Sequence, residues 1–242
     1  MINIVIPMAG LGSRFSEAGY EKPKSFIDVA GKVMIARVIE NLRCEDARFI
    51  LLAREEHLRE EITIVKQLKK EFDVIFVPID KTTEGTACTV LFARKYINNE
   101  EPLLIANSDQ IVDIDMNDFV RDCMKRNLDG SIMTFIDPHR DPKWSFAKID
   151  DNGIVKEVKE KSPISEHATV GIYFYSKGRD FVNAALDMII NNDRVNNEFY
   201  TCPAYNYAIK DKGKIGIYEV NFLKMHGLGT PGDLNEYLEV LV

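Results

Sequence analysis

The sequence predicts an α/β protein with a mostly parallel central sheet between two helical layers. Short apolar runs such as "INIVI" at 2–6 alternate with segments of helical periodicity over the first hundred residues. Near-continuous apolar strands are typical of parallel sheets buried on both faces, and strand–helix alternation builds βαβ units. After Asp109 the pattern changes to strands that include a hairpin signal. We therefore expect a Rossmann-like N-terminal half in a three-layer α/β/α fold, and a C-terminal half that adds mixed strands and a hairpin.

The N-terminal half is predicted to alternate four strands with three helices. Buried strands are expected at 2–8, 48–53, 73–79 and 103–107. Apolar residues that recur at helical spacing predict helices at 33–43, 56–70 and 87–97.

In the C-terminal half, Asp115 can cap a helix that runs as far as Asn127. The "DNG" between "FAKID" and "IVKEVKE" predicts a β-hairpin. Further strands are expected at "GSIMTFI", at "TVGIYFY" and near 214–220, and helices at 178–190, near 199–211 and after Pro231. Because no linker or repeat interrupts the pattern, we expect one domain over 1–242, with 1–110 as the nucleotide-binding half and 111–242 as the acceptor-binding half.

Composition limits the classes of function. The net charge is −7, from 31 basic and 38 acidic residues, which argues against general nucleic-acid binding. The four cysteines form no C-x-x-C pair, so a zinc or redox motif is not expected. No apolar stretch approaches the ~20 residues of a membrane span, and the N-terminus does not read as a signal peptide. We expect a cytoplasmic protein without a membrane partner. The sequence does not define the oligomeric state, and a homo-oligomer is one possibility.

The stretch "PMAGLGSRF" at 7–15 follows the first strand and allows three interpretations. A dinucleotide-binding turn needs a third glycine where Phe15 stands, and a Walker loop needs a G-K-[ST] ending that is absent. Two glycines alone fit a tight turn without a ligand. However, Arg14, Lys22 and Lys24 follow closely, and this loop leaves the carboxyl end of a strand, where open α/β sheets bind ligands. Glycines expose backbone N–H groups to an anion and the cations supply charge, so a polyphosphate site is favoured.

Six segments in order give the chain a family resemblance. They are "AGLGSRF…EKPKSFIDVAGKVMI", "EGTA" at 84–87, "LIANSDQ" ending at 110, "VKEVKEKSP" at 155–163, "ATVGIYFY" at 168–175 and "GLGTPGDL" at 227–234. Together they resemble the sugar-phosphate nucleotidylyltransferases, whose signature is G-x-G-x-R followed by P-K and an apolar strand. Each segment alone is a weak signal, but six in family order cover nearly the whole chain.

The resemblance implies a reaction of a nucleoside triphosphate (NTP) with a sugar 1-phosphate that gives a nucleoside diphosphate (NDP)-sugar and pyrophosphate, within the EC 2.7.7 class. It implies a GT-A-like nucleotidyltransferase fold and a role in making donors for capsule or surface polysaccharide synthesis. The attacking phosphate is already ionised at neutral pH, so positioning and electrostatics should dominate the catalysis.

Site residues follow from the same resemblance. Arg14 would bind the β- and γ-phosphates, Lys24 would bridge the α-phosphate and the leaving group, and Asp109 would hold Mg²⁺. Glu160 would bind acceptor hydroxyls, Lys161 the attacking phosphate, and Gly171 would leave room for the acceptor ring. The remaining predicted nucleotide contacts are Met8, Ala9, Gly10, Gly12, Ser13, Glu84, Gly85, Thr86, Asn107 and Ser108.

Each assignment has a plainer alternative. Asp109 could cap a turn, Glu160 and Lys161 could form a solvated hairpin edge, and Glu198 could cap a helix. Trp144 suits the acceptor site and the core equally well. The four histidines receive no catalytic role.

One position departs from the family pattern. Gly227 stands where members often carry a second metal-binding aspartate, and the nearest acid in that segment is Asp233. This departure keeps a second function open, a cytidylyltransferase for an alditol, choline or amino-acid phosphate. A catalytically silent nucleotide-binding regulator is the other alternative. The retention of Arg14, Lys24 and Asp109 argues against it, because a silent relative would be free to lose its charged groups.

Overall fold

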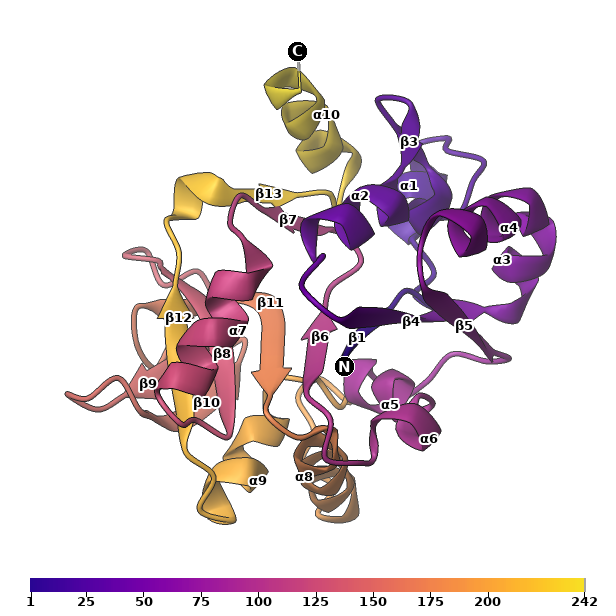
Figure 1. Ribbon diagram of the computed structural model, residues 1–242. Helices are drawn as coiled ribbons and strands as arrows, with labels where there is room; N and C mark the ends of the chain where they lie inside the picture. The colour runs from indigo at the N-terminus through magenta and orange to yellow at the C-terminus, as the bar shows by residue number, and fades with distance from the viewer. Residues whose placement is uncertain (242) are drawn as a thin grey trace.

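The computed structural model describes residues 1–241 and is built on one nine-stranded mixed sheet. Four strands pair in parallel in the order β6-β1-β4-β5, and β11 joins them to the antiparallel part of the sheet (Figure 1). The strands of this sheet are β1 (Ile2–Pro7), β4 (Ala47–Arg54), β5 (Val74–Ile79), β6 (Leu103–Ala106), β8 (Gly130–Ile136), β9 (Ser145–Ile149), β10 (Val155–Glu160), β11 (His167–Tyr175) and β12 (Ile215–Glu219). The predicted fold class is confirmed.

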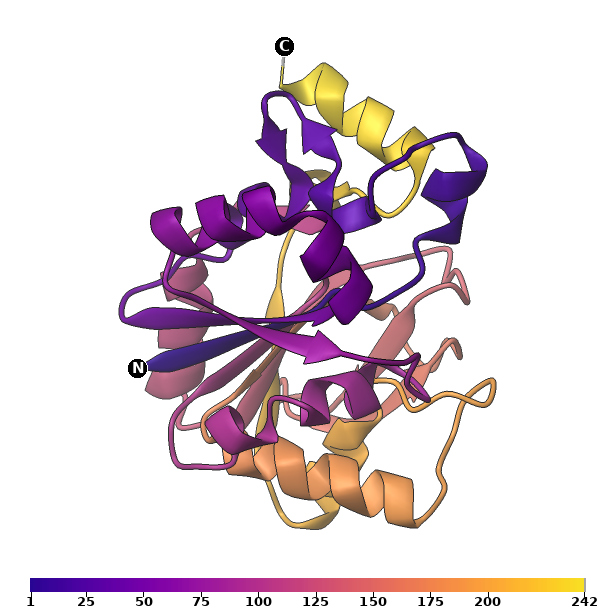
Figure 2. The same cartoon turned by 90° about the vertical axis from the view of Figure 1, so that its right-hand side faces the viewer.

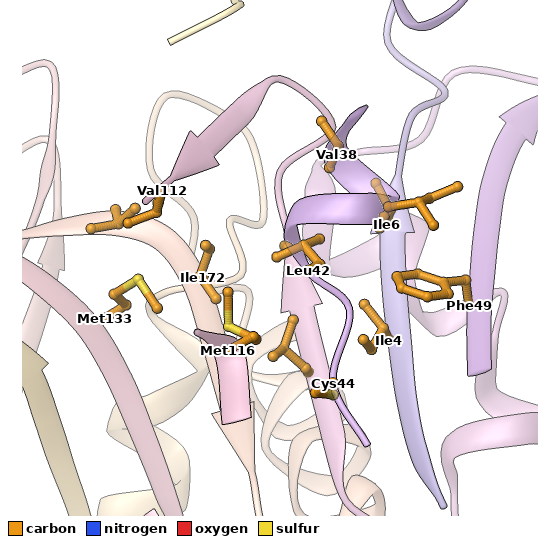
Figure 3. Packing of buried hydrophobic residues seen from close by; sticks show 14 of the residues in the cluster. Ile4, Ile6, Val38, Leu42, Cys44, Phe49, Val112, Met116, Met133 and Ile172 are labelled. Atoms are coloured by element: carbon orange, nitrogen blue, oxygen red, sulfur yellow. The ribbon is translucent and has the colours of Figure 1, made fainter. Parts of the chain in front are cut away.

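Both faces of the sheet are covered because its inner strands are apolar on both sides. Ile4 and Ile6 of β1 belong to one buried cluster and Val5 to the other, as the two-residue period of a strand requires. Figure 3 shows part of the first cluster, with Val38 and Leu42 packed over β1. The helices on that side are α2 (Met34–Asn41), α3 (Glu55–Glu60), α4 (Ile62–Glu71) and α7 (Met116–Lys125). Those on the other side are α5 (Thr86–Leu91), α6 (Arg94–Ile97), α8 (Gly178–Ile190) and α9 (Ala204–Lys210).

A third, smaller cluster joins the N-terminal loop to the C-terminal helix. Phe15, Val29 and Met34 pack there with Leu234 and Tyr237. This contact holds α10 (Pro231–Val240) beside the first loop of the chain (Figure 2). The short elements of this region are α1 (Ser13–Glu17), η1 (Lys24–Phe26), β2 (Asp28–Val29), β3 (Lys32–Val33), β7 (Gln110–Val112), η2 (Phe222–Lys224) and β13 (Met225–Gly227).

Several predicted elements are confirmed at close range. Asp115 caps α7, where its side chain accepts a hydrogen bond from the backbone N–H of Asn117. The expected hairpin is the antiparallel pair β9–β10, and α8 spans the expected 178–190. Among residues 1–241, no helix combines the length and the apolar character needed to cross a bilayer.

Two of the predicted helices are each divided into two shorter helices, and a third begins later than predicted. The helix expected at 56–70 is divided at Glu61, and the one at 87–97 is divided between Leu91 and Arg94. The helix expected near 199–211 starts only at Ala204. Its first residues are not helical because the backbone of Phe199 hydrogen-bonds across the chain to Glu84 and Ala87.

Candidate active site

A cavity of about 370 Å³ opens where β1 and β6 end. These are neighbouring parallel strands, so the segments after their carboxyl ends meet at one edge of the sheet. Nine of the predicted nucleotide contacts line this cavity, together with the predicted metal ligand Asp109: Met8, Ala9, Gly10, Gly12, Lys24, Gly85, Thr86, Asn107 and Ser108. Ser13, Arg14 and Glu84 do not line it. Arg14 is exposed on α1, two residues beyond Gly12.

The glycine loop sets the position of Lys24. Gly12 has a φ of +63°, and a Cβ at this position would come within 3.2 Å of the Cβ of Lys24. The loop therefore passes directly over the lysine, and its ammonium reaches Asp109, with 2.7 Å between Nζ and Oδ2. Both side chains are about a quarter exposed, at 23% and 26%. The structure thus brings together two charged groups that lie 85 residues apart in the chain.

Gly85 is held where no other residue fits. Its φ is +127°, and a Cβ there would overlap the backbone of Phe199. Phe199 donates its N–H to the carbonyl of Glu84 and accepts from the N–H of Ala87, at 2.8 and 2.9 Å. We call residues 84–87 the nucleobase loop, after the role that the family resemblance implies for Gly85 and Thr86. Residues 198–202, which we call the bridging segment, are bound to this loop through Phe199.

Five residues of the first cavity carry no signal strong enough to single them out in the sequence: His57, Thr82, Thr83, Thr89 and Glu198. The hydroxyls of Thr83 and Thr89 lie 2.6 Å from each other and within hydrogen-bond distance of the carbonyl of Gly85, at 3.0 and 3.2 Å, and this cluster of contacts holds the nucleobase loop. Burial lowers the pKa of His57, so this imidazole is neutral at neutral pH. Glu198, predicted at most as a helix cap, instead faces the cavity from the bridging segment.

A second cavity, of about 330 Å³, adjoins the first, and both are lined by Thr86 and Asn107. It contains all three predicted acceptor residues, Glu160, Lys161 and Gly171. Tyr200, Thr201 and Cys202 of the bridging segment also line it, so one segment borders both cavities.

The charged residues of the second cavity are held in defined positions. Glu160 accepts a short hydrogen bond from the hydroxyl of Ser145, and burial raises the pKa of Glu160 above its ordinary value. Lys161 has a φ of +53°, an unusual backbone conformation for a residue with a side chain. Its Nζ donates to the hydroxyl of Tyr200 at 2.6 Å, which raises the pKa of Lys161 and keeps it protonated.

Two further residues of this cavity refine the predictions. Trp144 lines the cavity and also packs edge-on against the core residue Phe135, and its role toward an acceptor stays a prediction. A Cβ on Gly171 would overlap the amide of Asn107, so this glycine makes room for that side chain. A direct role of Gly171 toward an acceptor ring stays a prediction.

The side chain that could bind a cation at this edge of the sheet offers oxygen ligands. Asp109 offers a carboxylate beside the first cavity, and carboxylates suit a hard ion such as Mg²⁺. Within residues 1–241, no three or more His, Cys, Asp or Glu side chains gather in a way that could hold a metal ion. A cation here would therefore depend on substrate phosphate oxygens as well.

The protein is therefore an α/β protein with two adjoining cavities at the edge of its sheet, and both cavities are lined by Thr86 and Asn107. The profile of the Nucleotidyl transferase family matches residues 4–206. The chain belongs to this family and so to the nucleotidyl-transferring enzymes of the EC 2.7.7 class, which confirms the resemblance drawn from its motifs.

Curated relatives and solved structures agree with this assignment. The chain is 28% identical over 250 residues to the bifunctional protein GlmU of Clostridium novyi, covering 98% of this chain and 51% of that protein. It is 22% identical over 180 residues to a putative mannose-1-phosphate guanyltransferase of Sulfolobus acidocaldarius, covering 73% and 49%. The chain thus spans about half the length of these relatives.

The fold is shared with a nucleoside-diphosphate-sugar pyrophosphorylase from Vibrio cholerae, with a TM-score of 0.84 at 23% identity, covering 98% of this chain and 99% of that one. The fold is also similar to that of the inositol-1-phosphate CTP transferase of T. maritima, with a TM-score of 0.76 at 13% identity, covering 99% of this chain and 94% of that one. At these identities the likeness concerns the fold.

Proposed function

We propose that this protein joins an NTP and a sugar 1-phosphate to give an NDP-sugar and pyrophosphate, in the cytoplasm, as a donor for surface polysaccharide synthesis. The observation that carries the proposal is the shared wall of the two cavities, formed by Thr86 and Asn107. Two substrates in adjoining cavities would have their reacting phosphates next to each other. Membership of the nucleotidyl transferase family and the similarity to sugar-nucleotide enzymes support it.

The proposed reaction needs charge stabilisation more than proton transfer. An oxygen of the acceptor phosphate attacks the α-phosphorus, and the bond between that phosphorus and the bridging oxygen to the β-phosphate breaks. The electron pair leaves with pyrophosphate, and the attacking oxygen carries no proton that must be removed. Positioning of the two anions and stabilisation of the charge on the leaving group account for most of the catalysis in such a step.

Lys24 and the glycine loop are proposed to act on the nucleotide. The ammonium of Lys24 leaves Asp109 for the α-phosphate and the leaving oxygen, a short movement because the lysine lines the same cavity. Backbone N–H groups of Gly10 and Gly12 are proposed to contact phosphates. Arg14, exposed at the start of α1, is proposed to bind the β- and γ-phosphates from the solvent side.

Glu160 and Lys161 are proposed to hold the acceptor. The Glu160 carboxylate accepts hydrogen bonds from acceptor hydroxyls, and the Lys161 ammonium, oriented by Tyr200, pairs with the attacking phosphate. The predicted roles of Gly85 and Thr86 are to face the base and ribose. The bridging segment contacts this loop directly, so the nucleotide and acceptor sites share one support.

Magnesium is the proposed cofactor. A carboxylate such as that of Asp109 suits this ion, and the ion pair that Asp109 forms with the Lys24 ammonium supports the proposal. The ion would supply charge neutralisation to the triphosphate.

The test is release of pyrophosphate by the purified protein with Mg²⁺. Each of ATP, GTP, CTP, UTP and dTTP is combined with a pool of sugar 1-phosphates, and in a second series with an alditol phosphate and phosphocholine. We expect release only when an NTP and a sugar 1-phosphate are both present. Release with the second series alone would favour the non-sugar cytidylyltransferase. Nucleotide binding without release from any pair would contradict the proposal and favour a silent binder.

A further inference from the structure

The C-terminal segment brings a second carboxylate next to Asp109. Strand β13 pairs with β7 so that Gly227 lies opposite Gln110, and the N–H of Leu228 donates to the carbonyl of Asp109 at 2.7 Å. The chain then turns through Gly229 into α10. The first turn of this helix carries Asp233.

Two glycines show where the Asp233 side chain points. A Cβ on Gly229 would lie 3.1 Å from Oδ2 of Asp109 and 3.7 Å from Oδ2 of Asp233, so both carboxylates border the same small space. A Cβ on Gly227 would lie 3.6 Å from Cγ of Asp233. The Asp233 carboxyl group thus lies in ordinary van der Waals contact with the place where a side chain at position 227 would start.

Helix capping does not account for this carboxylate. The cap of α10 is the hydroxyl of Thr230, which accepts from the backbone N–H of Asp233 at 3.1 Å and leaves the carboxylate unused. Within residues 1–241, the Asp233 carboxylate makes no hydrogen bond or ion pair. Lys24 supplies one positive charge, on the Asp109 oxygen that borders the space beside Gly229. Once Lys24 turns to a phosphate, two carboxylates border that space without a counter-charge.

We propose that Asp233 and Asp109 together hold the divalent cation, with Gly229 keeping the space between them open. The ion takes one oxygen from each carboxylate and completes its shell with triphosphate oxygens and water, as Mg²⁺ commonly does. The inference rests on the proposed function, since the nucleotide completes the site. It also gives a physical reason for glycine at 229, because any side chain there would occupy the space for the ion.

The test measures how much the metal tightens nucleotide binding, independently of turnover. Calorimetry with a non-hydrolysable α,β-methylene triphosphate, of the base that the wild type binds, gives Kd in Mg²⁺ and in EDTA. We expect Asp233→Asn to reduce the ratio of the two constants by at least about tenfold, since loss of even an outer-shell partner costs about 10- to 100-fold in metal affinity. Binding in EDTA should be unchanged or tighter, because one negative charge near the triphosphate is gone.

Three further variants sharpen the result. Gly229→Ala should also reduce the ratio, because its methyl group fills the space for the ion. Glu236→Gln removes a charge from an exposed position of the same helix and should leave both constants unchanged. Gly227→Asp added to Asp233→Asn should restore the ratio, because the new side chain starts next to the position of the Asp233 carboxyl group.

The outcomes separate this inference from the proposed function. An Asp233→Asn ratio equal to that of the wild type, with the ratio lost in Asp109→Asn, would overturn the role of Asp233 and leave the proposed function standing. A wild type that binds no triphosphate in either condition would overturn the proposed function itself.

Discussion

Replacing Lys24 by methionine separates catalysis from stability, because the structure predicts different magnitudes for the two. The Lys24–Asp109 pair is about a quarter exposed, so water can solvate the carboxylate that is left behind. Exposed pairs contribute about 0–1 kcal/mol, far less than fully buried ones. The free energy of unfolding should therefore fall by about 1 kcal/mol or less, which lowers Tm by no more than about 2–4 °C in a chain of this size.

The catalytic loss should be much larger. If Lys24 stabilises the charge that develops on the leaving group, its removal should lower kcat by about 10²–10³-fold, or 2.7–4 kcal/mol. The KM for NTP should change far less, because the interaction strengthens in the transition state. Initial rates of pyrophosphate release and thermal melting by circular dichroism measure the two effects. Lys32→Met, which breaks an exposed ion pair with Glu40, is the matched control. An essentially unchanged kcat in Lys24→Met would refute the assigned role.

Two other predictions concern the second cavity and the bridging segment. The raised pKa of Glu160 means that its carboxylate becomes protonated above the ordinary value of 4.5 as the pH falls, so the acceptor KM of the wild type should rise through that range. Glu160→Gln should raise the acceptor KM at neutral pH and abolish this pH dependence, whereas NTP binding measured by calorimetry should not change. The free energy of unfolding of this variant should not fall at neutral pH, because ionisation of the buried carboxyl group opposes folding above pH 4.5. Equal weakening of NTP and acceptor binding would show a structural role instead. Gly85→Ala should lower the free energy of unfolding by about 1–3 kcal/mol, because its φ is positive and its Cβ would meet the Phe199 backbone. Gly10→Ala is the control, since a Cβ there meets open space, and it should melt like the wild type. Equal melting temperatures of the two variants would contradict the close approach of Gly85 and Phe199.

The sequence was sufficient for the parts of the site that local patterns encode. Buried strands and the loop after β1 are readable because apolar runs and glycines have a direct physical meaning, and this placed Gly12 and Lys24 correctly at the first cavity. It also identified Asp109 as the residue that follows β6. What it could not give is the 2.7 Å contact between Lys24 and Asp109, which depends on how β1 and β6 pair.

The errors have a common cause in long-range backbone contacts. Residues 199–203 were predicted as the start of a helix, but Phe199 uses its N–H and carbonyl groups to bind the loop around Gly85, and α9 begins only after Pro203. The pairing of β13 with β7 was likewise not predicted, because three residues give too short a periodic signal. Both contacts join segments that lie far apart in the chain, and local sequence patterns do not encode such contacts.

These exceptions gather around the two cavities. Gly85 has a φ of +127° and Lys161 a φ of +53°. Such backbone conformations are rare and persist only where the surrounding structure holds them. Each lies against the bridging segment, Gly85 through Phe199 and Lys161 through Tyr200. Because one short segment fixes both, a shift of the nucleobase loop on NTP binding would be transmitted to the lysine that is proposed to hold the acceptor phosphate. Because such coupling is reciprocal, we expect each ligand to change the affinity for the other by the same factor, which calorimetry of either ligand in the presence of the other measures.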